Sequence, residues 1–295
     1  MGKALAETFP VCRDTFDQAD EALGEPLSRL CFEGPSAELT LTANTQPAVL
    51  AVSVAAHRLL ASRGLQAGLM AGHSLGEYSA HVAAGTLSFG DALRTVRRRG
   101  RYMQEAVPVG AGAMAAVLGL EAALVTQACE EAAQGEVVSP ANLNAPGQVV
   151  IAGAQDAVAR AGARARELGA RRVLPLPVSA PFHCRLMRPA QARLEPELRN
   201  LVVSNPAVPV IANVDAEPKR DAAAAIDALV EQVSAPVQWE AVVRRLASSG
   251  ARAYVEVGPG TVLAGLIGKI DRRASVVGVD SPDGIDAVEA LVPHG

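Results

Sequence analysis

The chain has 295 residues, of which 49% are hydrophobic and 20% are charged. A chain with this length and apolar content buries a core without disulfides or metal ions, which excludes a disordered, collagen-like or low-complexity protein. The 27 basic and 31 acidic side chains give a net charge of −4, so no overall positive field favours nucleic acid as a partner.

Cysteine usage and apolar runs indicate the compartment. The 4 cysteines are far apart and show no CxxC spacing, which favours reduced thiols in the cytoplasm over a disulfide framework or a zinc site. Residues 1–10 lack the apolar core of a signal peptide. The best apolar run, 47–56, is well short of the ~18 residues that a membrane span needs. We therefore expect a soluble cytoplasmic protein with no membrane partner.

Hydrophobic spacing predicts helices in the first part of the chain. Apolar residues between Leu5 and Leu23 recur as in one or two amphipathic helices. The elements predicted after them are a helix over 47–62, a strand over 68–71, a tight turn at 72–74, a helix to 84 with Gly85 as its cap, and a helix over 89–106.

Residues 111–179 have a different pattern, which predicts a separate subdomain. Its predicted elements are strand 113–120, helix 121–134, strands 137–143 and 148–152, helix 156–168 and strand 172–178. The order βαββαβ is that of a ferredoxin-like unit. We expect it as an insert in a larger α/β body made of residues 1–110 and 180–295.

The body continues with alternating helices and strands. Its predicted elements are helix 185–198, strand 208–212, helices 221–233 and 239–248, strand 253–257, helix 261–270 and strand 275–279. This alternation predicts an α/β hydrolase-like body with a mostly parallel sheet covered by helices.

Residues 72–76, Gly-His-Ser-Leu-Gly, form a G-x-S-x-G sequence between a predicted strand and a helix. This is the setting of a nucleophile elbow, in which small residues at 72 and 76 avoid collisions and Ser74 is the nucleophile. Free N–H groups at a helix start favour a developing oxyanion. The pattern does not separate a hydrolase from an acyltransferase.

A serine nucleophile needs a base, and His183 is the best candidate among the histidines. It lies in a predicted loop after a strand, where catalytic groups collect, whereas His57 and His81 fall inside helices, His73 shapes the turn and His294 is in the tail. The acids available to orient it, Asp91 and Asp156, both have roles as helix caps. A backbone carbonyl is the alternative.

The arginine cluster at 94–101 divides between two faces of its predicted helix. At ~100° per residue, four of the side chains form one stripe, Arg94, Arg97, Arg98 and Arg101. Arg99 lies about 150° away on the apolar side, where an unpaired guanidinium is costly, so it needs a protein carboxylate or an acidic substrate. The stripe is either a solvated face or a docking surface for an acidic partner. No metal-ligand cluster stands out.

GHSLGEYSA at 72–80 and PLPVSAPFHC at 175–184 carry a family resemblance. The chain resembles the malonyl-CoA:acyl carrier protein transacylases, the loading enzymes of type II fatty-acid synthesis. Further matching stretches are NTQPAVLAVSVA from residue 44, RRGRYMQEAVP from 98, GAMAAVLGL from 112, SPANLNAPGQVVIAG from 139, PVQW from 236 and YVEVGPG from 254.

The resemblance implies a ping-pong reaction in which malonyl moves from CoA to a serine and then to the phosphopantetheine thiol of the carrier protein. Ser74 resembles the nucleophile, His183 its base, and Arg99 the partner of the malonyl carboxylate. The Leu75 backbone N–H resembles an oxyanion donor, and the Gln232 carbonyl resembles the group that orients the histidine.

Gln46 and Asn142 match residues that line the family's pocket, and Phe182 is similar to a bulky residue of malonyl-selective members. The resemblance implies no cofactor, because the CoA thioester and phosphopantetheine are substrates. Its implied partners are malonyl-CoA and acyl carrier protein, and we expect a monomer. Whether the carrier serves fatty-acid or polyketide synthesis stays open.

One departure concerns the start of the chain. Family members begin with a buried strand and a G-Q-G-S-Q loop that supplies a second oxyanion donor, whereas this sequence begins at MGKALAE. Losing one donor costs roughly 10²–10³ in rate. We expect the natural product to carry that strand and loop, and we keep two alternatives to malonyl transfer: a serine esterase or thioesterase, and an inactive fragment.

Overall fold

The computed structural model describes residues 1–178 and 180–291, so His294 lies outside the described residues. The chain starts with helices α1 (Lys3–Thr8), α2 (Pro10–Leu23), α3 (Leu27–Glu33), α4 (Ser36–Leu39) and α5 (Thr42–Ser62). Helix α5 begins before Pro47, where the sequence predicted its start. The Asn44 and Thr45 N–H groups both donate to the Leu41 carbonyl at 2.8 Å, which establishes the first turn ahead of the proline.

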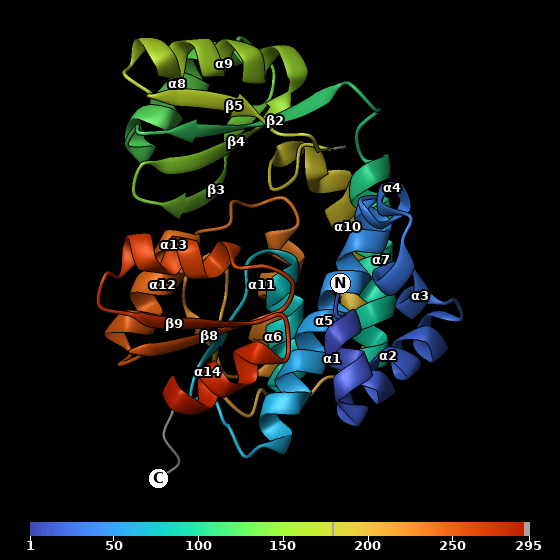
Figure 1. The fold of residues 1–295 in the computed structure, drawn as a ribbon. Helices are drawn as coiled ribbons and strands as arrows, with labels where there is room; N and C mark the ends of the chain where they lie inside the picture. Colours follow the sequence, from blue (N-terminus) through green and yellow to red (C-terminus); the bar gives the residue numbers. More distant parts are fainter. Residues whose placement is uncertain (179, 292–295) are drawn as a thin grey trace.

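A four-stranded sheet with two helices forms the upper part of the molecule in Figure 1. Its elements are β2 (Gly112–Leu118), α8 (Ala122–Ala133), β3 (Val138–Ala145), β4 (Gln148–Ala154), α9 (Gln155–Glu167) and β5 (Arg172–Pro175). The strand order is β3-β4-β2-β5 and all neighbours are antiparallel. Strand β5 ends at Pro175, before the predicted end at 178, although the Leu176 N–H still donates to the Met114 carbonyl at 2.9 Å.

The body holds two small sheets among its described residues, instead of the one mostly parallel sheet that was expected. Strands β1 (Met70–Ala71), β6 (Val210–Ile211) and β7 (Pro218–Lys219) form one, and β8 (Ala253–Val257) and β9 (Ser275–Val279) form the other. The β1–β6 and β8–β9 pairs are parallel, and β7 is antiparallel to β6.

Helices complete the body around these sheets. They are α6 (Leu75–Ala83), α7 (Phe89–Glu105), a 3₁₀ turn (Arg185–Met187), α10 (Arg188–Arg199), α11 (Ala222–Gln232), α12 (Trp239–Ser248), α13 (Val262–Ile270) and α14 (Asp283–Leu291). Sequence reasoning missed β7 and α14, although the buried Ile285 and Val288 of α14 are spaced three apart. In the described part of the chain, no helix combines the length and apolarity needed to cross a membrane.

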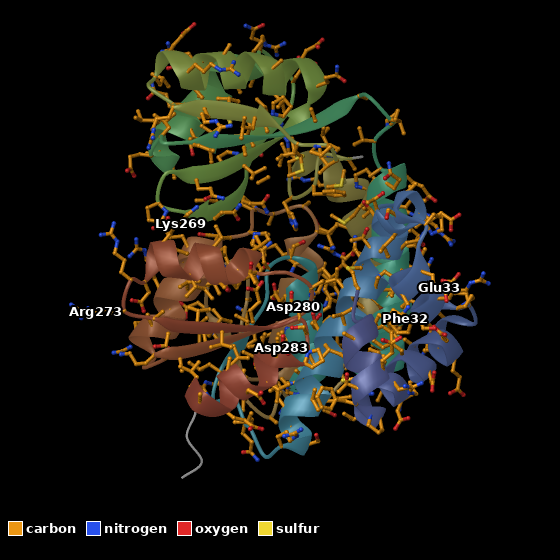
Figure 2. All side chains as sticks on the ribbon, viewed as in Figure 1. Phe32, Glu33, Lys269, Arg273, Asp280 and Asp283 are labelled. Carbon is orange, nitrogen blue, oxygen red and sulfur yellow. The ribbon has the colours of Figure 1, made fainter. Side chains whose placement is uncertain are left out.

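Close packing positions the elements that carry the candidate site. Helix α5 is buried along most of its length and contacts α2, α6, α7 and β8. A Cβ at Gly100 of α7 would lie 2.8 Å from the Ala43 Cα, so glycine allows α7 to approach the start of α5. On the other side, Lys269 of α13 lies below the four-stranded unit (Figure 2), and its Nζ donates to Gln148 Oε1 at 3.0 Å.

Candidate active site

The predicted nucleophile turn has a strained backbone. Ser74 follows β1 and precedes α6 with φ 51° and ψ −107°, a conformation that L-residues rarely adopt. A Cβ at Gly72 would lie 2.0 Å from the Gly76 carbonyl carbon, so only glycine fits there. The expectation that Gly76 also avoids a collision is wrong, since a Cβ at 76 would meet open space.

Ser74 and His183 meet although they are far apart in sequence. The Ser74 Oγ lies 2.7 Å from His183 Nε2, and His183 Nδ1 lies 2.9 Å from the Gln232 carbonyl oxygen. Because a carbonyl can only accept, Nδ1 carries the proton and Nε2 is free to accept the serine proton. Asp91 instead pairs with Arg94, and Asp156 lies in the first turn of α9. The carbonyl alternative therefore applies.

His183 is neutral in this environment. Its side chain is 3% exposed, and burial together with the nearby Arg99 charge lowers its pKa to about 3. A neutral imidazole can act as a general base at physiological pH. The positive charge of Arg99 therefore lowers the pKa of His183 and also acts on the Ser74 hydroxyl, to which Arg99 donates a hydrogen bond.

Arg99 is 2% exposed and bonds to three neutral oxygens. Its Nη1 donates to Gln46 Oε1 at 2.8 Å, and its Nη2 donates to Gln232 Oε1 at 2.9 Å and to Ser74 Oγ at 3.1 Å. Its guanidinium carbon lies 5.4 Å from the Tyr78 ring centroid. Among the described residues it forms no direct ion pair, so the protein-carboxylate alternative is met only indirectly: the buried Glu77 carboxyl acts on its charge, and Gln232 bonds to both groups. Burial lowers the pKa of Arg99.

The arginines on the opposite face of α7 mostly pair with carboxylates. Three of its arginines form ion pairs, Arg94 with Asp91, Arg97 with Glu25 and Arg98 with Glu197. Arg94, Arg98 and Arg101 are exposed as expected, whereas Arg97 is partly buried and also donates to Asn44 Oδ1 at 2.7 Å. The stripe is therefore mostly a solvated, neutralised face.

The other predicted site residues differ in their contacts with Ser74, His183 and Arg99. Leu75 opens α6, where helix N–H groups have no intrahelical acceptor. Gln46 contacts Arg99 directly. Asn142 is 7% exposed and pairs through its backbone with Val237, in the loop that follows α11, and it forms no hydrogen bond with Ser74 or His183. Phe182 is half-buried and packs against the four-stranded sheet and the body core.

Two polar residues at the site, Asn213 and Glu77, escaped the sequence analysis. Asn213 bonds to both sides of the Ser74 turn, and Glu77 is a fully buried carboxyl one helical turn after Ser74. His73 Nε2 lies 2.8 Å from Asn144 Oδ1, which fits its expected role in shaping the turn. Asn213 could have been found, because it follows a strand whose parallel neighbour ends at the nucleophile turn.

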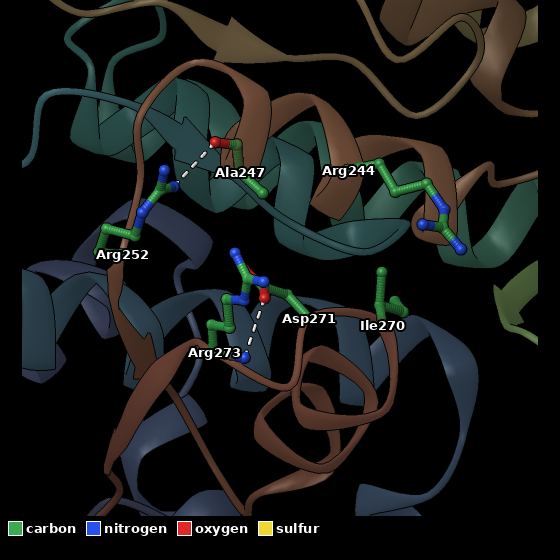
Figure 3. A pocket seen from close by; sticks show the side chains of 6 residues that line it. All are labelled: Arg244, Ala247, Arg252, Ile270, Asp271 and Arg273. Carbon is green, nitrogen blue, oxygen red and sulfur yellow. Dashed lines mark hydrogen bonds between the residues drawn. The ribbon is translucent and has the colours of Figure 1, made fainter.

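The other ionisable clusters lie apart from these residues. A surface hollow is lined by Arg244, Ala247, Arg252, Ile270, Asp271 and Arg273 (Figure 3). Two of its three arginines are occupied locally: Arg244 pairs with Glu240, and Arg252 donates to the Ala247 carbonyl at 3.0 Å. No group of three side chains placed to hold a metal ion occurs within residues 1–178 and 180–291.

Comparisons with known proteins agree with this geometry. The acyl transferase domain family matches residues 1–291. The malonyl CoA-acyl carrier protein transacylase of Salmonella typhimurium is 50% identical over 284 residues, which cover 96% of this chain and 92% of that protein.

Solved structures point the same way. An acyl carrier protein S-malonyltransferase from Vibrio cholerae has a TM-score of 0.96 and 48% identity, and the match covers 98% of this chain and 94% of that one. A malonyl-transacylase solved in complex with a type II PKS acyl-carrier protein has a TM-score of 0.95 and 46% identity, covering 99% and 94%. The chain therefore belongs to the malonyl CoA-acyl carrier protein transacylases, a family of acyltransferase enzymes.

Proposed function

We propose that this chain moves a malonyl group from CoA to the phosphopantetheine thiol of an acyl carrier protein through a malonyl ester on Ser74. The observation that carries the proposal is Arg99. Its buried guanidinium lies 3.1 Å from the nucleophile oxygen and has no carboxylate partner among the described residues. The free carboxylate of malonyl can accept two parallel hydrogen bonds from such a group. An esterase that cleaves neutral acyl chains binds no substrate carboxylate and so would not need the buried guanidinium of Arg99.

The first half-reaction follows from the hydrogen-bond order. His183 Nε2 takes the Ser74 hydroxyl proton while the serine oxygen attacks the thioester carbonyl carbon of malonyl-CoA. The Leu75 N–H at the start of α6 stabilises the resulting oxyanion. When the carbon–sulfur bond breaks, His183 returns the proton to the CoA sulfur. The Gln232 carbonyl holds the imidazole in the required tautomer throughout.

The second half-reaction reverses these roles. The carrier thiol gives its proton to His183 and attacks the ester carbonyl carbon, and the Ser74 oxygen leaves with that proton. The malonyl carboxylate also offsets the charge of Arg99, which lowers the pKa of His183 in the free protein. Substrate binding therefore makes the base stronger at the moment when it is needed.

Selectivity among acyl groups that carry a free carboxylate depends on the side chains that line the pocket. Gln46 orients the Arg99 guanidinium through its 2.8 Å hydrogen bond, and Asn142 lines the pocket from β3. Phe182, beside the base, crowds an α-methyl branch and so favours malonyl over methylmalonyl. Packing of Phe182 against two core clusters supports this role, because it limits how far the ring can move.

Partner, location and assembly belong to the same proposal. The related malonyl-transacylase solved with an acyl-carrier protein supports a carrier protein as acceptor. Buried, free cysteines support a cytoplasmic location, and we propose that the chain acts as a monomer. Both substrates bring their own thiol, so the reaction requires no further cofactor.

The strand order and antiparallel pairing of the smaller sheet support its description as ferredoxin-like, and the Ser74 turn between β1 and α6 supports a hydrolase-like body.

Labelling with malonyl-CoA tests the proposal. We expect the purified chain to gain one malonyl group, located on Ser74 by peptide mass spectrometry, and to lose it on addition of carrier protein. The Ser74→Ala variant should stay unlabelled, while an exposed serine variant such as Ser249→Ala should label normally. A folded wild-type protein that forms no adduct would overturn the proposal.

A further inference from the structure

Asn213 is a buried residue whose four polar groups are all engaged around the nucleophile turn. Its side-chain Oδ1 accepts from the Ser74 N–H at 2.6 Å, and its Nδ2 donates to the Gly72 carbonyl at 2.7 Å. Its backbone N–H donates to Glu77 Oε2 at 3.0 Å, and its carbonyl accepts from the Gln238 N–H at 2.9 Å. With 0% exposure, this residue has no freedom to rotate.

The sheet explains why Asn213 reaches the turn. Strands β1 and β6 are parallel, with Ala71 paired to Ile211, so the residues after each strand leave the sheet at the same edge. One strand continues into Gly72 and Ser74, and the other into Asn213. A single side-chain amide therefore spans the two peptide groups on either side of His73, the second of which leads into the strained Ser74.

Two further side chains complete the support. Gln232 Nε2 donates to the Ser74 carbonyl at 2.9 Å, so amides hold both the N–H and the C=O of Ser74. Glu77 Oε2 accepts from the Asn213 N–H and from Gln232 Nε2, the latter at 2.7 Å. The buried Glu77 carboxyl thus joins the two amides to each other.

We infer that Asn213 is a positioning residue for the acyl-transfer reaction: it holds Ser74 in its strained conformation, with the hydroxyl directed at His183. The inference rests on the proposed role of Ser74 as nucleophile. Strained conformations persist where the surroundings over-determine them, and here the backbone N–H and C=O of Ser74 are both fixed. A displacement of about 1 Å at a reacting atom costs roughly 10²-fold in rate.

An amide is the group that this place requires. The Ser74 N–H needs an acceptor and the Gly72 carbonyl needs a donor, and asparagine offers both from one planar group. In an Asn213→Asp variant, the ionised carboxylate would accept from Ser74 but would set an oxygen against the Gly72 carbonyl. Its protonated form restores a donor, so acid should rescue this variant.

The experiment measures malonylation of Ser74 against pH for the wild type and for Asn213→Asp. At pH 8 we expect the variant to be slower by about 10²-fold in kcat, with the KM for malonyl-CoA within about twofold of wild type, because Asn213 touches no substrate. Between pH 8 and pH 5.5 the variant should recover most of this loss. The matched control is Asn205→Asp, which alters an exposed asparagine that accepts from the Ala222 N–H.

Neighbouring ionisable groups are separated by controls. Glu77 accepts from the Asn213 N–H, Asp215 raises the pKa of Glu77, and Arg99 and His183 lie on the other side of Ser74. Because burial raises the pKa of Glu77 to about 7, inside the measured range, the control is the double variant Asn213→Asp/Glu77→Gln, which should keep the acid rescue. Protonation of His183 does not interfere, because its pKa of about 3 lies below the measured range.

The outcomes separate the positioning role of Asn213 from the proposed acyl-transfer function. Asn213→Asp at wild-type rate at pH 8, or folded but inactive at every pH, would overturn the positioning role, whereas an unlabelled wild type would overturn the proposed function instead. If the variant does not fold, hydrogen exchange at the wild-type Ser74 amide decides. Slow exchange supports the hydrogen bond to Asn213, and exchange as fast as in an exposed loop contradicts it.

Discussion

Helix α7 carries arginines on two faces with opposite fates. On the outer face, Arg94, Arg97 and Arg98 each find a carboxylate from the protein, so their charges are neutralised within the fold. On the inner face, Arg99 bonds to neutral oxygens and keeps its charge beside the nucleophile. The comparison shows that the buried cation, not an exposed one, is left without a direct ion pair among the described residues; the Glu77 carboxyl acts on it only through space and through Gln232.

Removing the inner cation should have the largest effect. We expect Arg99→Ala to slow malonyl loading of Ser74 by about 10²–10³-fold, because truncating one partner of a buried charged pair costs roughly 2–5 kcal/mol. Acetyl loading, which offers no carboxylate, should change far less. Rates from both acyl-CoA substrates check this, and equal losses would remove the selectivity argument.

Stability should also respond to the buried charges on the inner side. Burial raises the pKa of Glu77 to about 7, so its contribution to stability is full below its ordinary value of 4.5 and is lost as pH rises through about 7. The shift corresponds to about 3 kcal/mol between pH 4.5 and pH 8. Urea unfolding at several pH values checks it. Glu77→Gln should flatten this dependence, and an unchanged slope would show that Glu77 is not its source.

The pH dependence of kcat/KM should respond to a charge on the inner face of α7 and not to one on its outer face. Because burial and Arg99 hold the pKa of His183 near 3, kcat/KM for malonyl-CoA should stay level down to pH 5. Arg99→Gln removes one of these causes, so the acid limb should move to higher pH by about one unit. Arg97→Gln on the outer face is the control and should not shift it. A wild-type limb near 6.5 would contradict the assignment.

The smallest effect should come from the outer face. Arg101 is exposed and has no ion pair among the described residues, so it is the stripe's least neutralised charge. We expect Arg101→Glu to raise the KM for carrier protein by no more than about threefold, as for a screened rim charge. A tenfold rise, absent in an exposed control such as Arg29→Glu, would establish the stripe as the docking surface.

Local patterns predicted the elements well where their periodicity was long. Helix α7 and the strands and helices between 112 and 175 lie within a few residues of their expected bounds. The short strands β1 and β6 lie inside the ranges predicted for them, 68–71 and 208–212, whereas β7 was missed because its two residues leave little apolar pattern. The division of the body into two sheets could not be predicted, since strand pairing depends on contacts between distant segments.

The amino-acid sequence by itself determined the chemistry of the site: a serine shortly after a glycine that permits a sharp turn, a loop histidine, and an arginine on the apolar side of its helix. These are local features, fixed by steric limits and helical geometry. Only the tertiary structure decided which groups those side chains meet. The carbonyl of Gln232, the amide of Asn213 and the carboxyl of Glu77 reach the turn because parallel strands end together and helices pack around them, and no local pattern encodes such long-range contacts.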